Sequence, residues 1–335
     1  MPKIKIAMNW AGACGGCDVS LLDLEQGFLD LAEIADIVYW PVALDFKRKD
    51  LQAMPDNSLD IGLFNGVLRT SEQEEDALLM RSKCKVLIAY GSCSCFGGIP
   101  GLANLSGKEE ILATAYQQTS STTNPEQILP QPESTVNGQT LTLPAFSQRV
   151  RTLQDLARVD YFLPGCPPAQ ESLEQALQVI SDYAQGKELP PAGSFLAQDH
   201  ALCQDCPRRE SKKANRIRQV LRPHQIQADP ELCFLEQGLI CMGPFTRSGC
   251  GGLCIQANQP CRGCYGPAPG QLDPGAEAMS SLGTVVGPNG EDFMTRGEMK
   301  RETGRILDPA GSFYRFTLPS AIIYRSFRPD KENKE

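Results

Sequence analysis

Short apolar runs alternate with longer amphipathic segments through the first half of the chain. Five runs have the length and composition of buried strands: residues 3–10, 36–42, 59–66, 85–93 and 159–166. Between them, residues 21–34, 71–83 and 169–186 repeat apolar side chains at helical spacing. A capping-box pattern, Ser71-x-x-Glu74, opens the second of these helices. The alternation predicts a flavodoxin-like, doubly wound α/β domain with a parallel sheet over residues 1–190.

The pattern changes in the second half. The stretch GKELPPAGS (186–194) is typical of a linker, and residues 104–147 form a polar insertion that is partly loop. From about residue 195 the chain is dense in Gly, Pro and Cys, with few periodic segments. Such a segment buries little apolar surface alone and is more easily stabilised by bound metal. We therefore predict a smaller, irregular Cys-rich domain over residues 195–335.

Charge and composition limit the possible functions. The 335 residues carry a net charge of −8, which does not suit a nucleic-acid binder. We find no apolar run near the roughly 20 residues that span a bilayer, and no signal peptide, so we expect a cytoplasmic protein. Fourteen cysteines are unusual in that compartment, where disulfides are rare, and they indicate metal binding.

Four of the cysteines are expected to meet at one edge of the sheet. Cys14, Cys93 and Cys166 each follow a predicted strand, and Cys17 lies three residues after Cys14. The carboxyl ends of parallel strands are where open α/β sheets bind ligands. Cys95 competes with Cys93 in the GSCSC stretch, and we favour Cys93. The remaining Cys84, at a helix-to-strand junction, is interpreted as a packing residue.

The other eight cysteines fall into two further sets of four. These are Cys203, Cys206, Cys233 and Cys241, then Cys250, Cys254, Cys261 and Cys264. Spacing leaves open an exchange of members between the two sets. Cys-x-x-Cys pairs are typical of zinc sites as well as of iron–sulfur clusters. Three quartets, one of them assembled from separate loops at a sheet edge, favour clusters over structural zinc.

At these residues the sequence resembles the small subunit of [NiFe] hydrogenases. The matching motifs are C-G-G-C-D (14–18), G-S-C-S-C-F-G-G-I-P-G (91–101) and P-G-C-P-P (164–168), followed by C-x-x-C-P-R, G-C-G-G-L-C and P-C-R-G-C-Y-G-P. The second and third motifs are shared with a relative, the cluster-bearing small subunit of respiratory complex I. The later motifs favour the hydrogenase. The features as a set look like the cytoplasmic methyl-viologen-reducing, heterodisulfide reductase-linked group.

The resemblance implies three [4Fe-4S] clusters. It assigns Cys14, Cys17, Cys93 and Cys166 to the proximal cluster, Cys203, Cys206, Cys233 and Cys241 to the distal cluster, and Cys250, Cys254, Cys261 and Cys264 to the medial cluster. Two departures from the membrane-bound uptake type are Cys203, in place of the usual distal histidine, and a fourth medial cysteine, Cys254. The implied partners are a large subunit that holds the Ni–Fe centre, an iron–sulfur adaptor subunit and a heterodisulfide reductase-type complex, with no membrane span.

The expected role is to conduct electrons and not to make bonds, so we name no catalytic residue. We find no nucleophile–base pair or phosphate loop. The two histidines, His200 and His224, are interpreted as surface or core residues. The basic stretch 207–222 is interpreted as a solvated helix face, with docking to an acidic partner as the alternative. Competing hypotheses are a complex I-like electron-transfer subunit and a zinc-stapled interaction scaffold.

Overall fold

A computed structural model describes residues 3–212, 217–287 and 295–325. The strands are β1 (Ile4–Trp10), β2 (Ala35–Tyr39), β3 (Leu59–Asn65), β4 (Leu68–Thr70), β5 (Cys84–Tyr90), β6 (Glu133–Val136), β7 (Gln139–Thr142), β8 (Phe146–Arg151), β9 (Tyr161–Leu163) and β10 (Ser194–Phe195). The α-helices are α1 (Gly16–Leu22), α2 (Gln26–Ile34), α3 (Arg48–Ala53), α4 (Ser71–Lys83), α5 (Gly91–Phe96), α6 (Lys108–Ala113), α7 (Gln170–Ala184), α8 (Leu202–Asp205), α9 (Leu253–Gln256), α10 (Pro274–Val285), α11 (Arg296–Thr303), α12 (Pro309–Phe313) and α13 (Ile322–Arg325). Shorter helical turns are η1 (Ile99–Leu105), η2 (Thr114–Gln118), η3 (Leu153–Asp155), η4 (Arg209–Ser211), η5 (Gly243–Phe245) and η6 (Leu318–Ser320).

The first half folds around a six-stranded parallel sheet. Its strand order is β10-β9-β5-β3-β1-β2, and every neighbouring pair runs parallel. Leaving the short β4 aside, this is the flavodoxin-like order, with the direction of winding reversing between β1 and β3. The sequence-based prediction of the fold class is confirmed. Ligands of such sheets bind outside the carboxyl ends of the strands at that reversal.

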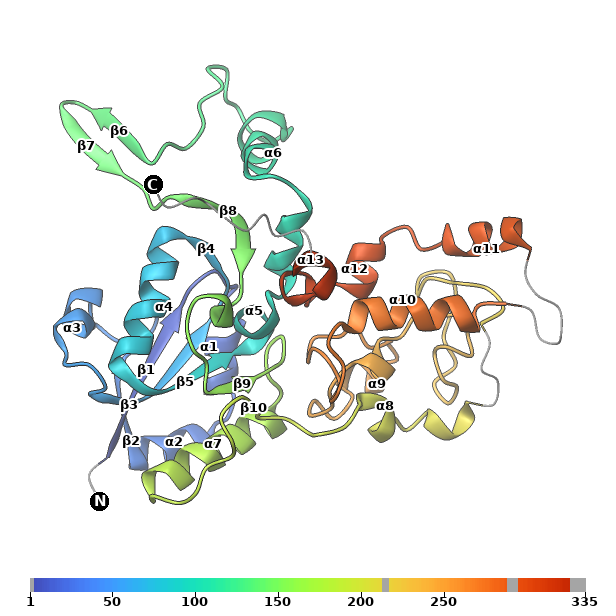
Figure 1. Cartoon of the computed structure of the whole chain (residues 1–335), viewed down its shortest axis with the longest axis horizontal. Coiled ribbons are helices and arrows are strands. Elements are labelled where there is room, and N and C mark those ends of the chain that lie inside the picture. The colour runs from blue at the N-terminus through green and yellow to red at the C-terminus, as the bar shows by residue number, and fades with distance from the viewer. Residues whose placement is uncertain (1–2, 213–216, 288–294, 326–335) are drawn as a thin grey trace.

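Helices cover both faces of this sheet (Figure 1). One core joins the sheet to α1, α2 and α7, with Leu21, Leu31 and Leu173 among its buried side chains. The opposite core joins it to α3, α4 and α5, with Met80 and Phe96 buried there. Because both faces are covered, the strands are mostly apolar, as in other parallel sheets.

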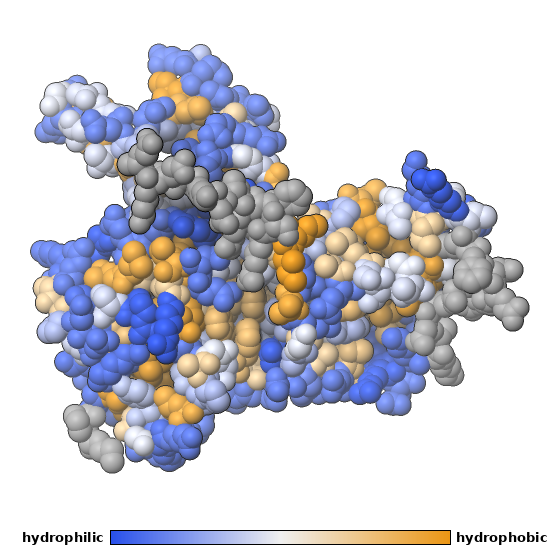
Figure 2. All heavy atoms as spheres, in the orientation of Figure 1, coloured by the Kyte–Doolittle hydropathy of each residue, from blue (hydrophilic) through white to orange (hydrophobic). Residues whose placement is uncertain are grey.

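The second half has its own buried core, which is built from different elements. Side chains from α8, α10, α12 and the loops that carry the later cysteines form it, and Phe234, Leu239 and Phe313 are among the most buried. Figure 1 shows these elements side by side, with α13 at the junction with the sheet domain. On the face in Figure 2, hydrophilic residues dominate and an apolar strip marks α13, where Ile322 and Ile323 are exposed.

Two local sequence predictions need correction. Residues 21–34 form the end of α1 and all of α2 and not one helix, because the chain turns at Glu25, whose φ is 48°. The turn lets Leu24 and Leu31 bury against the same sheet face. Helix α4 begins at Ser71 as predicted, but Thr70 and Gln73 form its capping box. Glu74 instead pairs with Arg151 on β8.

The polar insertion is a projecting arm. It contains α6, η2 and the antiparallel hairpin β6–β7, and every residue of the two hairpin strands is exposed. Figure 1 shows the arm extending away from the sheet domain. The basic stretch 207–222 differs from the prediction as well. Its described residues form only the turn η4, and Arg208 is buried. None of the helices in the described ranges combines the length and the apolarity needed to cross a bilayer.

Asp60 on β3 connects three strands and a helix at the amino edge of the sheet. Its carboxylate accepts hydrogen bonds from the backbone N–H of Lys5 (2.8 Å), from Lys85 Nζ (2.8 Å) and from the Tyr183 hydroxyl (3.2 Å). Burial alone raises the pKa of Asp60, but the bonds from Lys85 and Lys5 outweigh it, so the pKa lies below its usual value.

We expect Asp60→Asn to lower the free energy of unfolding by about 1 kcal/mol at pH 7. A carboxylate with a lowered folded-state pKa stabilises the fold above its unfolded pKa of about 4, and this contribution is lost as the pH falls further. The difference from wild type should therefore shrink toward pH 3, as measured by urea unfolding. Asp36→Asn, at an exposed aspartate on β2, is the control. A difference that grows on acidification contradicts the prediction.

Candidate cysteine-lined site

The first two cysteines are placed by the start of α1. Cys14 lies in the loop after β1 and Cys17 in the first turn of the helix. The Cys17 carbonyl accepts hydrogen bonds from the Tyr90 hydroxyl (2.7 Å) and from Ser20 Oγ (2.8 Å). Tyr90 ends β5 and is fully buried. These bonds tie the Cys14–Cys17 loop to the carboxyl end of the central strand.

The loops that carry Cys93 and Cys166 are bonded directly to one another. The backbone N–H of Ser92 donates to the Gly165 carbonyl at 2.7 Å. Cys93 lies on α5, directly after β5, and Cys166 follows β9, the neighbouring strand. Three strand ends thus bring four cysteines to the carboxyl edge of the sheet, beside the reversal between β1 and β3.

The four thiols perturb one another electrostatically. Burial raises the pKa of Cys17, and Cys93, Cys166 and Cys14 raise it further. The pKa of Cys93 is raised to about 12 by burial and by the neighbouring Cys166 and Cys14. The pKa of Cys166 is raised by burial and by Cys14. Four ionised thiols at this place would repel each other, so a bound cationic group is needed to stabilise them as thiolates.

Two glycines leave room beside these sulfurs. A Cβ added to Gly91 would lie 2.3 Å from Cys17 Sγ, and one added to Gly98 would lie 2.5 Å from Cys93 Sγ. Both residues have positive φ, 83° and 55°. Side chains are therefore excluded where the backbone approaches the thiols, a feature that suits a bulky group held close to the main chain.

The two cysteines outside the quartets pack in the core. Cys95 is fully buried and its Sγ donates to the Ala89 carbonyl at 3.3 Å, within the core on the α5 side of the sheet. Cys84 is also fully buried, against Gly62. Both Cys93 and Cys95 lie near the first set: Cys166 and Cys14 raise the pKa of Cys93, and Cys17 and Cys93 raise that of Cys95, after burial in each case.

Asp18 is buried beside Cys17. Its carboxylate accepts hydrogen bonds from Trp40 Nε1 (2.8 Å) and Asn65 Nδ2 (2.9 Å), and 4% of the residue is exposed. Asp18 lies in the first turn of α1, where a carboxylate also interacts favourably with the helix dipole.

The second set lines a pocket of the Cys-rich half. Cys203, Cys206, Cys233 and Cys241 all border it, together with Arg208 and Lys212. Burial, Cys206 and Cys233 raise the pKa of Cys203. Burial raises the pKa of Cys241 to about 11, although hydrogen bonds from the backbone of Gly243 and Cys261 oppose the rise. The structure therefore brings these four residues together.

Arg208 shapes this pocket, and the sequence did not reveal its role. Its guanidinium donates to the carbonyls of Asp229 (3.0 Å) and Leu232 (3.3 Å) and to Asn258 Oδ1 (2.8 Å). It also stacks 4.1 Å from the centre of the Phe234 ring. The only sequence signal was the motif C-x-x-C-P-R. Because its partners come from residues 21 to 50 positions away, their identity could not be read from the pattern.

The third set lies between the other two. The pKa of Cys264 is raised to about 12, mainly by burial and then by Cys250, by Cys166 of the first set and by Cys254. A hydrogen bond from the Cys166 backbone lowers this pKa. Burial and Cys241, of the second set, raise the pKa of Cys261. Cys264 therefore adjoins the first set and Cys261 adjoins the second. In space, the order of the quartets is first, third, second.

A hydrogen-bonded tyrosine fixes the contact between the sheet domain and the third set. Tyr265 is 1% exposed, and its hydroxyl accepts from the Ala169 backbone N–H at 2.7 Å. The same hydroxyl donates to Ser172 Oγ at 3.2 Å, and Ser172 donates to the Gly249 carbonyl at 2.9 Å. Ser92 Oγ also donates to the Cys264 carbonyl. These bonds join α5 and the start of α7 to the loops around Cys250 and Cys264.

Binding of a single metal ion would require at least three ligating side chains close together. Within residues 3–212, 217–287 and 295–325, no three His, Cys, Asp or Glu side chains are grouped so as to hold a single metal ion. His200 is bonded to Asp205 on the surface (2.6 Å), and His224 is exposed.

Comparison with known proteins shows relatives over nearly the whole chain. A family model described as "NADH ubiquinone oxidoreductase, 20 Kd subunit" matches residues 14–180. The iron–sulfur subunit of the F420-non-reducing hydrogenase of Archaeoglobus profundus is 38% identical over 326 residues, covering 96% of this chain and 98% of the relative. The corresponding subunit of the F420-non-reducing hydrogenase of Methanothermobacter marburgensis is 34% identical, covering 96% of each chain.

A solved structure shares the fold. The [NiFeSe] hydrogenase of Desulfovibrio vulgaris Hildenborough matches with a TM-score of 0.51 and 14% identity, covering 80% of this chain and 94% of that one. The match extends beyond the sheet domain into the Cys-rich half, because the sheet domain alone is shorter than the covered share.

We expect Tyr265→Phe to loosen the contact between the sheet domain and the third set. It leaves the partly buried Ala169 N–H without its acceptor, which costs about 1 kcal/mol of unfolding free energy. Hydrogen exchange of a peptide that includes Ala169 should accelerate. Tyr116→Phe, at an exposed tyrosine of the arm, is the matched control and should leave exchange unchanged. Equal exchange in Tyr265→Phe and wild type contradicts the prediction.

Proposed function

Because the chain belongs to the family of iron–sulfur subunits of F420-non-reducing hydrogenases, small subunits of [NiFe] hydrogenases, we propose that it carries electrons through three [4Fe-4S] clusters. The chain is an electron-transfer subunit of an oxidoreductase, and the hydrogen-splitting Ni–Fe centre belongs to a large partner subunit. Electrons released by hydrogen oxidation pass through the clusters of this chain to an acceptor subunit. The number and type of the clusters and the identity of the acceptor are our proposals.

We assign each quartet to one cluster. Cys14, Cys17, Cys93 and Cys166 hold the proximal cluster in the sheet domain, residues 1–190. In the Cys-rich domain, residues 195–335, Cys250, Cys254, Cys261 and Cys264 hold the medial cluster, and Cys203, Cys206, Cys233 and Cys241 hold the distal cluster. Thiolates are the usual ligands of [4Fe-4S] clusters, four to each.

The observation that carries this proposal is the spatial order of the quartets. Cys264 adjoins Cys166, and Cys261 adjoins Cys241, so the third quartet connects the first with the second. A subunit that only needed metal for stability has no reason to link a site at a sheet edge to two others in a continuous line. This continuity favours electron conduction over a zinc-stapled scaffold. The eight later cysteines disfavour a complex I-like subunit, which needs only the first quartet.

The residues present fit such clusters. Two thiols of the first quartet lie directly against the backbone of Gly91 and Gly98, where a Cβ would clash with Cys17 Sγ or Cys93 Sγ. The third quartet offers backbone donors as well: the N–H groups of Gly252 and Leu253 point toward Cys250, and that of Gly263 toward Cys261. Donors of this kind stabilise the negative charge of cluster sulfur and tune its potential.

The acceptor side is proposed from the family resemblance. We propose that electrons leave the distal quartet for an iron–sulfur adaptor subunit and a heterodisulfide reductase-type complex. Cys203, Cys206 and Cys233 are partly exposed, so the second quartet is accessible to an acceptor. The proteins that co-purify with the chain identify this acceptor directly.

Anaerobic analysis of iron, sulfide, zinc and nickel tests the cluster assignment. We expect about 12 iron and 12 sulfide per chain, with nickel only in the large partner. Cys93→Ser should remove about four iron, because it deletes a ligand of one cluster. Cys95→Ser is the matched control, since Cys95 is bonded to a core carbonyl, and it should retain the iron content of wild type.

Other outcomes have definite meanings. Zinc with little iron overturns electron transfer in favour of the scaffold. About four iron together with zinc leaves only the proximal cluster and favours the complex I-like alternative. Loss of iron in Cys95→Ser but not in Cys93→Ser shows that the ligand of the first quartet was assigned wrongly.

We expect Gly98→Ala to reduce loading of the proximal cluster alone. The new methyl group would lie 2.5 Å from Cys93 Sγ and 2.9 Å from Cys93 Cα, at a backbone φ that disfavours side chains. Up to about four iron per chain should be lost, while the other eight remain. Gly107→Ala is the control, because its φ is −69° and the nearest atom would be 3.7 Å away. Wild-type iron content in Gly98→Ala contradicts the prediction.

A further inference from the structure

A second pocket lies in the Cys-rich half, and none of the residues that line it also lines the pocket of Cys203, Cys206, Cys233 and Cys241. Its volume is about 300 Å³, at the lower end of the range for small-molecule sites. Four arginines from four separate segments line it: Arg222, Arg262, Arg305 and Arg315. Among the described residues, Asp308 is the only acidic one in its wall. This concentration of positive charge contrasts with the net charge of −8 on the whole chain.

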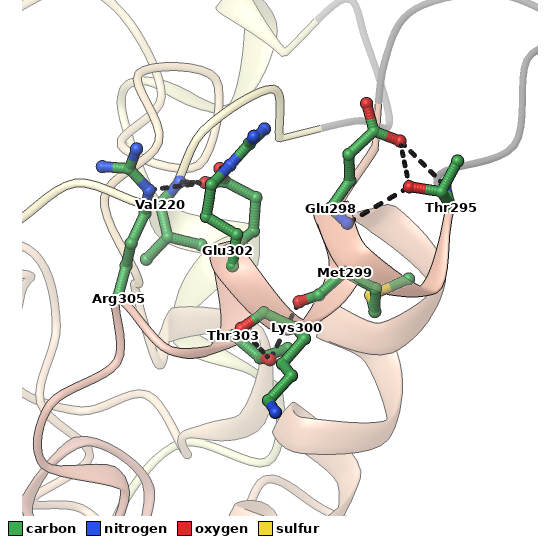
Figure 3. A network of polar contacts seen from close by, with 9 residues as sticks. Val220, Thr295, Glu298, Met299, Lys300, Glu302, Thr303 and Arg305 are labelled. Atoms are coloured by element: carbon green, nitrogen blue, oxygen red, sulfur yellow. Dashed lines mark hydrogen bonds and ion pairs between the residues drawn. The ribbon is translucent and has the colours of Figure 1, made fainter.

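The negative charges near the pocket are already engaged. Asp308 caps α12, accepting from the Gly311 backbone N–H at 2.8 Å. Glu302 is buried behind the pocket and pairs with Arg305 Nε at 3.0 Å, as well as with Arg301 and the Val220 N–H. Figure 3 shows Arg305 and Glu302 meeting beside Val220. Glu302 therefore neutralises at most one of the four arginines.

Two of the guanidinium groups, those of Arg222 and Arg262, lack an acceptor among the described residues. In the part of the chain that the structure describes, no carboxylate, carbonyl or hydroxyl accepts a hydrogen bond from the guanidinium of Arg222 or Arg262. Arg315 donates one hydrogen bond among the described residues, from its Nε to the Gly311 carbonyl at 3.0 Å. Arg262 is partly buried and lines the same pocket as Arg315 and Arg222. Like charges are held together here at a cost that a bound anion would offset.

The pocket wall also has an apolar side. The apolar residues that line it are Val220, Leu221, Ile240, Ile306 and Leu307. A guanidinium presents paired N–H donors that match the oxygens of a phosphate, and several of them balance its double negative charge. The apolar wall suits an organic group attached to that phosphate, because small-molecule sites combine a few polar anchors with apolar surface.

We propose that this arginine-lined pocket binds a phosphate-bearing small molecule. Arg222, Arg262 and Arg315 hold the phosphate oxygens, while Arg305 stays oriented by Glu302. No cysteine of the three quartets, all of which lie in the described residues, lines the pocket, although Arg262 lies between Cys261 and Cys264 of the third set.

Isothermal titration of the purified protein, with the subunits that accompany it, tests the site. The probes are inorganic pyrophosphate and ADP, with a glutamate-rich peptide as a third ligand. We expect one phosphate ligand per chain, with affinity weakened at least about tenfold in Arg222→Gln/Arg315→Gln, since hydrogen bonds to charged groups are lost. Arg296→Gln, at an exposed arginine of α11 outside the pocket, is the control and should bind as wild type.

The three probes separate the possible occupants. Tighter binding of ADP than of pyrophosphate supports an organic phosphate, and equal binding supports an inorganic one. Binding of the peptide without either phosphate ligand overturns the proposal in favour of an acidic protein segment. Absence of any binding, or equal weakening in the pocket and control variants, also overturns it. Iron content measured on the same samples shows that a loss of binding does not follow from a loss of clusters.

Discussion

The hydrogen bonds of Tyr265 and Ser172 are the constraint on which the arrangement of the cysteine sets depends. They attach the amino end of α7, three residues after Cys166, to the loops around Cys264 and Cys250. The Gly249 carbonyl that they satisfy is buried and the Ala169 amide is partly buried, so another orientation of the two halves would leave those groups without these partners. The polar contacts thus select one relative position, and in that position Cys166 and Cys264 are neighbours.

Burial of so many thiols makes the Cys-rich half dependent on what it binds. Desolvation is the largest cause of the raised pKa at Cys241, Cys261 and Cys264 alike. Without a bound group these thiols stay protonated and make few strong interactions. A cationic cluster reverses this, because it stabilises the thiolates and cross-links distant loops at once, so its binding free energy adds to that of folding.

The sheet could be predicted from the sequence because each strand is recognisable from its own residues. A strand buried on both faces is mostly apolar, so β1, β3 and β5 could be recognised from their own residues, and the cysteines that follow β1 and β5 were placed with them. The break at Glu25 was missed because it depends on how α1 and α2 both reach the sheet. Arg208 and the four arginines of the pocket were missed for the same reason. Their partners and neighbours come from segments that only the tertiary fold brings together.

The charges around the first and second quartets differ in sign, and this difference has a consequence for the proposed direction of electron flow. Asp18 raises the pKa of Cys17 in the first quartet, whereas Lys212 and Arg209 lower that of Cys203 in the second. Arg208 adds a buried positive charge to the second pocket, where its hydrogen-bond partners in the described residues are carbonyl groups and an amide. A cluster becomes more negative on reduction, so positive charge favours its reduced form and negative charge disfavours it. These nearby charges favour the reduced form of a cluster at the second quartet over one at the first, which agrees with the proposed direction from hydrogen oxidation toward the acceptor.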